Sequence, residues 1–505
     1  MIEALNRDDS SNRLRRIVIV GGGSAGWMAA AALSQVTRIP IVLIESDAIG
    51  TVGVGEATIP QIRTFNRALG IDERNFVRET NGSFKLGIRF VGWNGDGSDY
   101  IHAFGQVGRG TGVIPFHHLW LRAQAAGLAG PFGDYALNDV AARAGKMAMP
   151  GGGMPAQGTN MPWAYHFDAS LYAAFLRRLS EQRGVQRIEG KIVDVAVDRE
   201  RQSIGSITLE DGQSIEGDFF VDCSGFRALL ISQLDGSDMQ DWSHWLPCDS
   251  AQAVPCQSDR PLSPFTTSTA HKAGWQWHIP LQSRVGNGVV YCRAFMSDEE
   301  ARDQLLANID GPPDAEPRQI RFTTGTRRKH WVGNCLAVGL SAGFLEPLES
   351  TSIHLIQYSV ARLMAMLPRR DVDPAIVDAF NHEISQQWAR IRDFLILHYW
   401  ANGRVGEEFW DACRTMDLPA SLTEKIDQFR AAGHFTRQDE ELFTQVGWSQ
   451  VFLGQGIVPN SWHPLADEMS EIELRDLLSS IKSQHGRMTS AMPTHGEFVD
   501  AFIHH

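Results

Sequence analysis

Two apolar runs near the start of the chain predict the first strands of an α/β fold. The segments Ile17-Val18-Ile19-Val20 and Ile41-Val42-Leu43-Ile44 are continuously apolar, which is the pattern of buried parallel strands. Between them lie the glycine-rich residues 21–26 and a helical stretch from Trp27 to Ser34. This order of strand, glycine-rich turn, helix and strand predicts the opening βαβ unit of a Rossmann-type domain.

The rest of the chain divides by its pattern into an α/β body and a mostly helical cap. Glycine, proline and methionine are dense in residues 105–160, which predicts long loops. Further on, the patterns predict a helix over 165–183, a β-meander over 187–222, strands over 265–296 and mostly helices beyond residue 355. For a chain of 505 residues we therefore expect two packed parts, a body of residues 14–104 and 161–354 and a cap of residues 105–160 and 355–505.

An alternation of apolar and polar residues predicts one continuous strand over residues 81–90. Lys85 and Arg89 lie on its polar face, and the apolar face consists of Phe84, Leu86, Ile88 and Phe90. On this pattern alone Lys85 is a solvated strand lysine. In a desolvated site, however, its pKa would fall, and its neutral amine would be a nucleophile and a hydrogen-bond donor.

Two tryptophans at positions 275 and 277 predict a flat wall on one face of a strand. They belong to the segment Gly274–Pro280, and residues two apart in a strand face the same side. Pro280 can end this strand because it has no N–H group to give to the ladder. By themselves, Trp275 and Trp277 are most simply part of the packed core.

Composition and charge limit which partners the protein can bind and indicate the cellular compartment in which it works. The formal net charge is −13, which argues against nucleic acid or an anionic membrane as a partner. The six cysteines form no CxxC pair and no ligand-spaced cluster, so we expect free thiols, a cytoplasmic location and no metal site. Residues 1–16 are polar and lack the apolar core of a signal peptide, and no segment approaches the length of a membrane span.

The glycine-rich turn after the first strand predicts a dinucleotide-binding site. Its first glycine permits a tight turn, its second lets the backbone approach a pyrophosphate, and its third lets the helix pack on the strand. The N–H groups at the start of the helix would face the anion, and an acid about 20 residues further on would bind the ribose. The predicted contacts are Gly21, Gly23, Ser24, Ala25, Gly26 and Glu45.

Two further segments bear on which dinucleotide is bound. The turn Gly339–Gly343 lies where a strand enters a helix, as does the late flavin-contacting turn of FAD enzymes, and it favours FAD over NAD. Gly339 and Leu345 are its predicted contacts. The loop over residues 52–60 is either an ordinary connection between strand and helix or a strap across the isoalloxazine ring. Its predicted contacts are Gly53, Gly55, Glu56 and Ala57.

The segment Glu346–Ser352 predicts the start of a helix and a place for an anion. Ser350, Thr351 and Ser352 are residue types that cap a helix, here one expected from Ile353, and the N–H groups at a helix N-terminus bind anions. Glu349 is then either an acid favoured by the helix dipole or a buried carboxylate beside a halide site.

Taken together, these motifs resemble the flavin-dependent tryptophan halogenase family over nearly the whole chain. The matching segments are the glycine fingerprint at 21–26, GEATIP at 55–60, the Lys85 strand, AYHFD at 164–168, DCSGFR at 222–227, WQWHIP at 275–280 and FLEPLEST at 344–351. Each segment is weak alone, and the combination is specific. The resemblance implies a Rossmann-type, flavin monooxygenase-like FAD-binding body with a mostly helical substrate-binding cap and a tunnel between them.

The resemblance also implies a reaction divided between two places. A separate NADH-dependent reductase supplies FADH2, which reacts with O2 to a flavin C4a-hydroperoxide, and attack by halide gives hypohalous acid. Lys85 holds the acid or captures it as a haloamine, and Glu349 polarises it or takes the proton from the arenium ion. Ser350 is the adjacent carbonyl-bearing residue. Near the flavin, the implied halide contacts are Thr351 and Ser352, and the barrier between substrate and peroxide is Trp275, Trp277, Ile279 and Pro280.

The same resemblance bears on the substrate, which we expect to be a small aromatic. His102 and Phe104 match rings that stack on the indole in tryptophan-specific members, and Trp448 is a further stacking candidate. Those members clamp the charged groups of tryptophan with a C-terminal segment containing Tyr-Tyr, whereas the last tyrosine here is Tyr399. A buried site without partners for these charges penalises a zwitterion. We therefore expect bromination or chlorination of free indole or another electron-rich arene.

Three alternatives stay open on the sequence. The chain is a tryptophan halogenase proper, an aromatic FAD monooxygenase that hydroxylates its substrate, or a catalytically silent flavoprotein. Lys85, Glu349 and the tryptophan pair distinguish the first two chemistries. Position 352 is Ser where the family commonly has Gly, which bears on the size of the halide site. A homodimer is one arrangement that the sequence leaves open.

Overall fold

The two apolar runs at the start of the chain form neighbouring parallel strands. In the computed structural model, which describes residues 12–48, 55–149 and 161–504, β1 (Ile17–Val20) pairs in parallel with β2 (Ile41–Glu45) and β12 (Phe219–Asp222). They belong to a six-stranded sheet of order β20-β21-β12-β1-β2-β8, in which β20–β21 is antiparallel and the other pairs are parallel. The outer strands are β8 (Gln186–Glu189), β20 (Trp331–Val332) and β21 (Cys335–Ala337).

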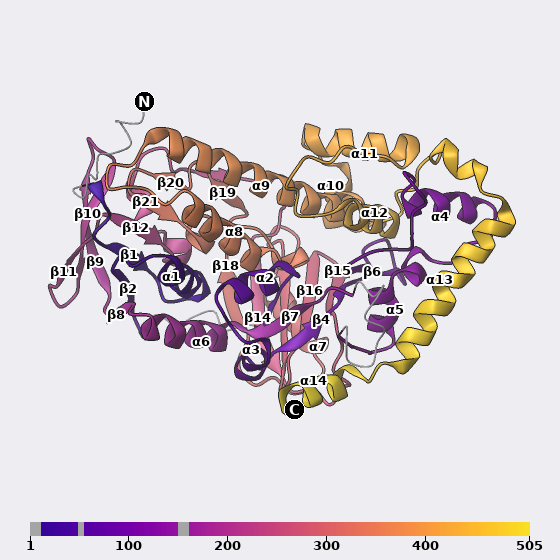
Figure 1. Cartoon of the computed structure of the whole chain (residues 1–505), viewed down its shortest axis with the longest axis horizontal. Coiled ribbons are helices and arrows are strands. Elements are labelled where there is room, and N and C mark those ends of the chain that lie inside the picture. The colour runs from indigo at the N-terminus through magenta and orange to yellow at the C-terminus, as the bar shows by residue number, and fades with distance from the viewer. Residues whose placement is uncertain (1–11, 49–54, 150–160, 505) are drawn as a thin grey trace.

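The predicted Rossmann-type body is therefore present. All of β1 is buried, and α1 (Ser24–Val36) packs against β1 and β2 on one side of the sheet (Figure 1). The predicted meander over 187–222 gives a separate antiparallel sheet before the chain returns to the centre as β12. Its strands are β9 (Ile192–Asp198), β10 (Ser203–Leu209) and β11 (Ser214–Glu216).

A seven-stranded sheet carries the two tryptophans near the middle of the molecule (Figure 1). Its order is β18-β14-β17-β16-β15-β5-β6, and only β15–β5 is a parallel pair. The strands are β5 (Gly87–Val91), β6 (Asp99–Ala103), β14 (Ser250–Cys256), β15 (Thr266–His271), β16 (Gly274–Pro280), β17 (Val285–Tyr291) and β18 (Arg318–Arg321). As predicted, β16 ends at Pro280.

The strand predicted over residues 81–90 is interrupted, so that prediction was wrong. The chain forms β4 (Ser83–Lys85) in a small sheet with β7 (Ala164–Asp168) and β3 (Gly55–Ala57), and only then enters β5. Leu86 lies at the break, where its N–H donates to the carbonyl of Pro264 and its own carbonyl accepts from Phe104. Because tertiary partners hold the chain here, both faces of β4 are buried.

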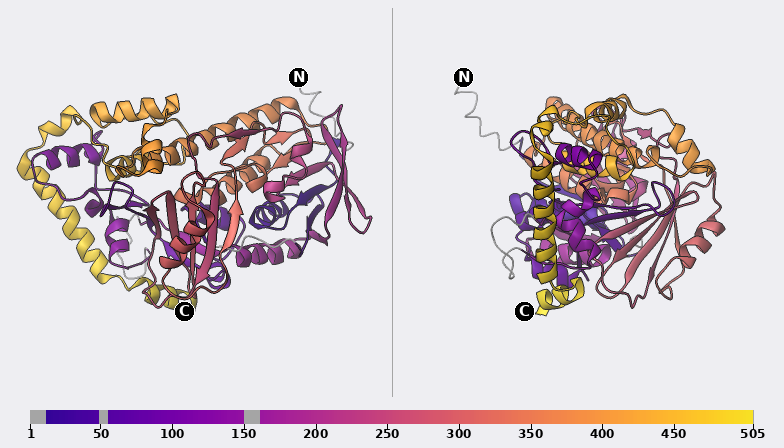
Figure 2. Two further views of the ribbon diagram at one scale, coloured as in Figure 1. Left: turned by 180° about the vertical axis from the view of Figure 1, so that it is seen from behind. Right: turned by 90° about the vertical axis from the view of Figure 1, so that its right-hand side faces the viewer.

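The C-terminal third of the described chain is helical, as predicted. Its longer helices are α8 (Ser352–Ala365), α9 (Pro374–Trp400), α10 (Glu408–Thr415), α11 (Ala420–Ala432), α12 (Gln445–Gly454), α13 (Glu471–Ala491) and α14 (His495–His504). In the left view of Figure 2, α13 runs along the edge of the molecule, and in both views it ends beside α14. The remaining helices are α2 (Gln61–Ala68), α3 (Glu73–Glu79), α4 (Phe116–Ala125), α5 (Leu137–Arg143), α6 (Ala169–Gln182) and α7 (Asp298–Ala307).

Contacts between helices cross the predicted boundary between body and cap. Within the cap, α13 packs on α4 and α5, so its two segments meet in space. At the boundary, α8 packs on α1 of the body, and α14 packs on α3 and β4. The division into domains stays a prediction, and residues 355–505 do not stand apart from the body.

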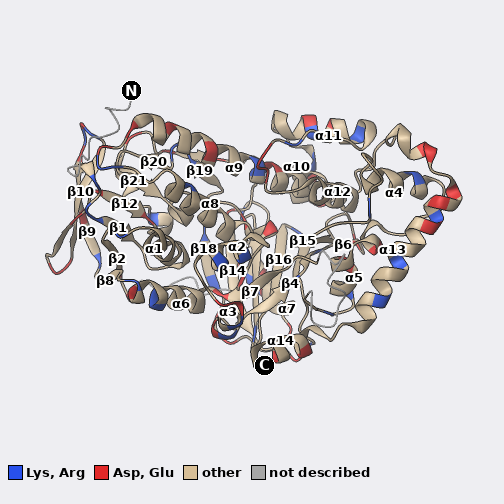
Figure 3. Ribbon diagram, viewed as in Figure 1, with Lys and Arg blue, Asp and Glu red and all other residues tan. Residues whose placement is uncertain are grey.

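The distribution of charge, the cysteines and the possible membrane or metal-binding elements bear on the predictions from composition. Acidic and basic residues are interspersed along α11 and α13 (Figure 3). All six cysteines are buried and free. Within the described ranges, no helix combines the length and the apolar character needed to cross a membrane. In the same residues, no group of three or more His, Cys, Asp or Glu side chains is placed to hold a metal ion.

Candidate active site

Lys85 and the segment after β22 (Gly343–Phe344) meet in the interior of the protein. The Lys85 side chain is fully buried, and its Nζ donates a hydrogen bond of 2.7 Å to Ser350 Oγ. Burial lowers the pKa of Lys85 to about 7, although the nearby Glu349 carboxylate opposes this shift. The alternative of a solvated lysine is thereby excluded, and a large share of Lys85 carries a neutral amine near neutral pH.

Glu349 lies between two buried histidines. Its Oε2 is 2.9 Å from His102 Nδ1, and its Oε1 is 2.9 Å from His398 Nε2. Burial by itself raises the pKa of this carboxyl group, but His102 and His398 together outweigh burial and lower it to about 2. Glu349 is therefore a buried carboxylate that stays ionised over the working pH range, not a surface acid at a helix start.

The N-terminus of α8 lies directly beside these groups. Ser350 has a left-handed backbone conformation with φ of 59°, which turns the chain between the 3-10 helix η7 (Pro347–Glu349) and α8. The prediction that hydroxyl groups cap this helix was wrong: no side chain caps it, the Ser350 hydroxyl binds Lys85, and α8 begins at Ser352, one residue before the expected start. The Thr351 hydroxyl is buried without a hydrogen-bond partner. The first N–H groups of α8 thus remain available to an anion.

The two tryptophans of β16 form the predicted wall. The ring centroids of Trp275 and Trp277 lie 6.1 Å apart on one face of the sheet. A Cβ atom at Gly288 on the neighbouring strand would come within 2.0 Å of the Trp277 ring, so this position must be glycine for the ring to lie there. Trp275 Nε1 donates a 2.9 Å hydrogen bond to Glu346 Oε2, which also accepts from the Tyr399 hydroxyl.

Ile279 and Pro280 have different surroundings. Ile279 continues the wall towards β3, where a Cβ atom at Gly55 would lie 3.3 Å from Ile279 Cγ2. Pro280 lines a cavity on the opposite face of the sheet, and its carbonyl accepts from Ser83 Oγ. The structure therefore groups Ile279 with the tryptophans and separates Pro280 from them.

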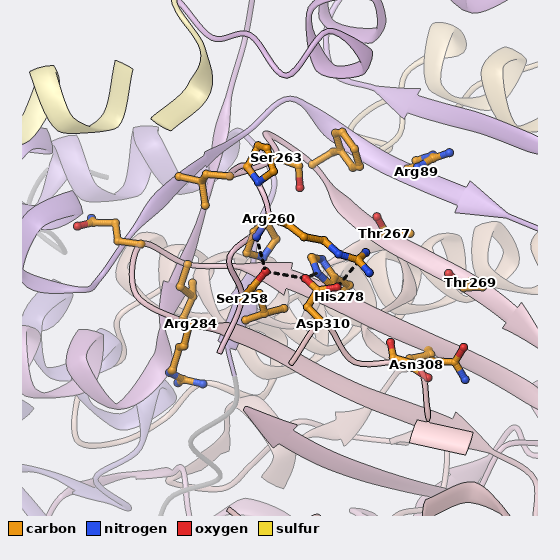
Figure 4. A pocket seen from close by; sticks show the side chains of 18 of the residues that line it. Arg89, Ser258, Arg260, Ser263, Thr267, Thr269, His278, Arg284, Asn308 and Asp310 are labelled. Carbon is orange, nitrogen blue, oxygen red and sulfur yellow. Dashed lines mark hydrogen bonds and ion pairs between the residues drawn. The ribbon is translucent and has the colours of Figure 1, made fainter. Parts of the chain in front are cut away.

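The cavity lined by Pro280 has a volume of about 500 Å³ and a mixed polar and apolar lining (Figure 4). His278 Nε2 lies 2.8 Å from Asp310 Oδ2, and Ser258 Oγ donates to the same oxygen. Its lining includes Thr267, Thr269 and Gln276 but neither Lys85 nor Glu349. This cavity is therefore distinct from the candidate active site, which lies on the tryptophan side.

The glycine fingerprint fits a dinucleotide. A Cβ atom at Gly21 would lie 2.1 Å from the Cys223 carbonyl oxygen, and one at Gly26 would lie 1.8 Å from the Gly21 carbonyl oxygen. At Gly23, in contrast, nothing lies within 4 Å of the Cβ position, and no side chain caps α1. The open face at Gly23 and the free N–H groups are what a pyrophosphate requires.

Two of the other predicted cofactor contacts, Gly339 and Glu45, lie against the same turn. A Cβ atom at Gly339 would lie 2.8 Å from Ala25 Cβ, so the late turn touches the early one. The Glu45 carboxylate packs against Gly22, where a Cβ atom would come within 1.4 Å, and pairs with Arg187. Gly22 was missed because the fingerprint leaves that position free. Leu345 and Ala57 are buried, Gly55 and Glu56 lie in β3, Ser24 begins α1, and Gly53 lies outside the described residues.

The two predicted substrate residues near Lys85 differ in what they contact. Phe104 has its ring centre 5.6 Å from Lys85 Nζ, as a residue beside the reacting centre would. His102 is tied to Glu349 by the hydrogen bond described above. It also lies near the rings of Phe394 and Phe443, at 5.6 and 6.1 Å.

Trp448 is buried in the same aromatic cluster, with its ring centre 4.7 Å from that of Phe394. Phe394 and His398 lie one turn apart on α9, and Tyr399 follows them. Sequence reasoning missed these three residues, since a helix of mixed composition gives no local signal for them. Only their spacing of four hinted that Phe394 and His398 share a face.

These features define a flavoprotein that holds a buried lysine and a buried carboxylate behind a tryptophan wall. Over residues 16–471 the sequence matches the family model described as tryptophan halogenase. Tryptophan 6-halogenase ThaL of Streptomyces albogriseolus is 34% identical to it, over 96% of this chain and 97% of that protein. The chain belongs to the tryptophan halogenase family.

Solved structures agree with this assignment. Xcc4156, a flavin-dependent halogenase from Xanthomonas campestris, superposes with a TM-score of 0.93 and 47% identity, over 97% of this chain and 98% of that one. BrvH, a flavin-dependent halogenase from Brevundimonas sp. BAL3, superposes with a TM-score of 0.93 and 42% identity, over 97% of this chain and 99% of that one. The protein is thus a flavin-dependent halogenase, an oxidoreductase that uses FADH2 from a separate reductase, O2 and halide. This confirms the family, fold and cofactors predicted from the sequence.

Exchange of single fingerprint glycines should separate folding from cofactor binding. Gly23→Ala should leave the melting temperature of the apoprotein nearly unchanged and weaken FAD binding, because its methyl group enters only the open face. Gly26→Ala should lower the melting temperature of the apoprotein, because its methyl group clashes with the Gly21 carbonyl oxygen. The cost of this clash should exceed the gain of about 1 kcal/mol in helix propensity. Thermal melting and FAD titration measure both effects. Equal loss of stability in the two variants would contradict this assignment.

Proposed function

We propose that this halogenase acts on free indole or a similar electron-rich arene and delivers the halogen as hypohalous acid to Lys85. The observation that supports this most is the joint burial of Lys85, Ser350 and Glu349 beside the tryptophan wall. Bound FADH2, together with O2 and halide, supplies the oxidised halogen. The residues of the chain then hold the halide, deliver the halogen and remove a proton.

Lys85 is suited to hold or capture the oxidised halogen. Its hydrogen bond to Ser350 Oγ fixes the amine, and burial provides a neutral fraction near pH 7. The uncapped N–H groups of Thr351 and Ser352 are suited to the halide ion. Trp275, Trp277 and Ile279 are suited to stand between the flavin and the substrate, so that a small oxidant passes and an aromatic substrate does not.

Glu349 is suited to receive the proton that substitution releases. When the halogen adds to the ring, the adjacent C–H bond must break, its electron pair returns to the ring, and the proton goes to a base. A carboxylate held by two histidines stays ionised and stays in one orientation. The same carboxylate polarises the electrophile held at Lys85.

The surroundings of Trp448 favour a neutral arene over free tryptophan. Lys425 is a cation close to this cluster, with Nζ 4.3 Å from the Trp448 ring centre, but it already contacts both oxygens of Glu441. It is therefore not free to bind a substrate carboxylate. With no tyrosine beyond Tyr399, the tyrosine clamp of the tryptophan-specific members is absent from the sequence. An unpaired buried charge costs the zwitterion several kcal/mol.

A competition assay tests the substrate. With a flavin reductase, NADH, FAD, O2 and bromide, we expect kcat/KM for indole to exceed that for L-tryptophan by about 100-fold, or about 2.7 kcal/mol. Mass spectrometry should show bromoindole. A preference for L-tryptophan would overturn the substrate proposal and leave the halogenase intact. Hydroxyindole without bromoindole would favour the monooxygenase reading.

A further inference from the structure

His398 contacts the catalytic carboxylate from the side away from His102. It lies on α9, is fully buried, and places Nε2 2.9 Å from Glu349 Oε1. The distance is that of a hydrogen bond, whereas the direction is less favourable, so the contact is foremost electrostatic. His102, in contrast, hydrogen-bonds both oxygens through Nδ1.

The other nitrogen of the His398 ring fixes where its hydrogen lies. Nδ1 is 2.9 Å from the carbonyl oxygen of Phe394, one turn earlier on α9. A carbonyl oxygen only accepts, so Nδ1 carries a hydrogen. If the ring were neutral, Nε2 would present a lone pair to a carboxylate oxygen at 2.9 Å, and the two would repel. Either the His398 ring or the Glu349 carboxyl group must therefore carry a further proton.

We propose that His398 is an imidazolium ion that keeps Glu349 ionised and oriented, and that it is therefore a positioning residue for halogenation. This inference rests on the proposed role of Glu349 as the base. The two oxygens of the carboxylate then have separate partners, His398 on Oε1 and His102 chiefly on Oε2. The low pKa of Glu349 agrees with this assignment of the proton to the histidine side.

The groups around this pair leave few cations that can face Glu349. The His398 ring is enclosed by the rings of Phe90, Trp93 and Phe394, at 4.8, 6.1 and 5.3 Å. The titratable groups that face Glu349 from other elements are Lys85 on β4, and Tyr100 and His102 on β6. Burial and the Glu349 charge raise the pKa of Tyr100, so it remains neutral. When Lys85 loses its proton, the remaining groups that can carry a positive charge beside Glu349 are His102 and His398, and only His398 has its Nδ1 hydrogen fixed by a backbone carbonyl.

Helix α9 also contacts Glu346, the other glutamate of the segment Glu346–Ser352. Tyr399, the next residue, donates to Glu346, which holds Trp275. Glu346 Oε1 has no partner, and burial raises the pKa of Glu346 to about 7. Two neighbouring glutamates are thus set to different charge states, because a histidine faces Glu349 and a neutral hydroxyl and an indole face Glu346.

Infrared titration of the Glu349 carboxyl group tests the inference without any turnover. The difference spectrum between each protein and its Glu349→Gln counterpart isolates this band. In the wild type it should remain that of a carboxylate at about pH 4.3, the ordinary value for glutamate. In His398→Phe the band should become that of a protonated acid at this pH, since a buried carboxylate without its cation has a raised pKa.

A second variant guards against loss of folding. His398→Gln retains an N–H donor of similar reach but cannot carry a full charge, so its band should titrate between those of the wild type and His398→Phe. Halogenation at pH 7 should fall by about 10- to 100-fold in kcat for His398→Phe, with KM little changed, and less for His398→Gln. A titration identical to the wild type in both variants would overturn the inference while the halogenase function stood. Absence of halogenation in the wild type would overturn the proposed function and leave the titration interpretable.

Discussion

Replacement of Lys85 by alanine should abolish halogenation while the oxidation of FADH2 by O2 continues. The amine of this side chain donates a hydrogen bond to Ser350, and it lies beside Glu349 and the ring of Phe104. Without it nothing holds the oxidised halogen at the place where the arene is expected. We expect kcat for bromination to fall on the order of 10³-fold or more, with NADH consumption and hydrogen peroxide release close to those of the wild type.

Lys85→Met is the matched control, because it retains the shape of the buried side chain without the amine. It should lose halogenation as Lys85→Ala does, but it should unfold at a higher temperature than the wild type. The folded-state pKa of about 7 lies below the ordinary value of 10.5, so burial of the protonated amine opposes folding. Between these values the unfolded chain holds the extra proton, and wild-type stability rises with pH. The difference in melting temperature between Lys85→Met and the wild type should therefore become smaller from pH 7 towards pH 10. Bromination undiminished in either variant would contradict the role of Lys85.

The parts of the fold that the sequence predicts are those with a local cause. Gly21, Gly23 and Gly26 each answer a steric demand within the same turn, and the apolar runs beside them must be buried. For the same reason the tryptophan wall was predictable, since residues two apart in a strand share a face whatever surrounds them. The family resemblance added residues that such patterns cannot reach, chief among them Lys85 and Glu349.

What was not predictable depends on contacts far apart in the sequence. The alternation around Lys85 read as one strand with a solvated face, but Pro264 and Phe104 interrupt it at Leu86 and bury both faces. The roles of His398 and Tyr399 arise only when α9 folds back over the segment that carries Glu346 and Glu349. A single histidine within a helix has no pattern of its own, and its charge depends on the carboxylate that it meets.

Glu349→Gln should cause the second large loss of halogenation activity. The amide keeps the size of the side chain, but it cannot take up the proton that substitution releases. It must also turn an NH2 group towards one of the two histidines that now meet the carboxylate. We expect kcat for bromination to fall by about 10²- to 10³-fold with KM for indole little changed, which is the signature of an interaction made in the transition state.

Glu346→Gln, the same exchange three residues earlier, is the control variant for Glu349→Gln. Glu346→Gln keeps an oxygen that accepts from Trp275 and Tyr399, and it resembles the protonated acid that burial already favours. Its kcat should therefore fall by no more than about threefold, or about 0.7 kcal/mol in the barrier. Comparable losses in both variants would mean that the segment Glu346–Ser352 matters only as a packed unit. A large loss at Glu349 alone would separate the base from the residue that anchors the wall.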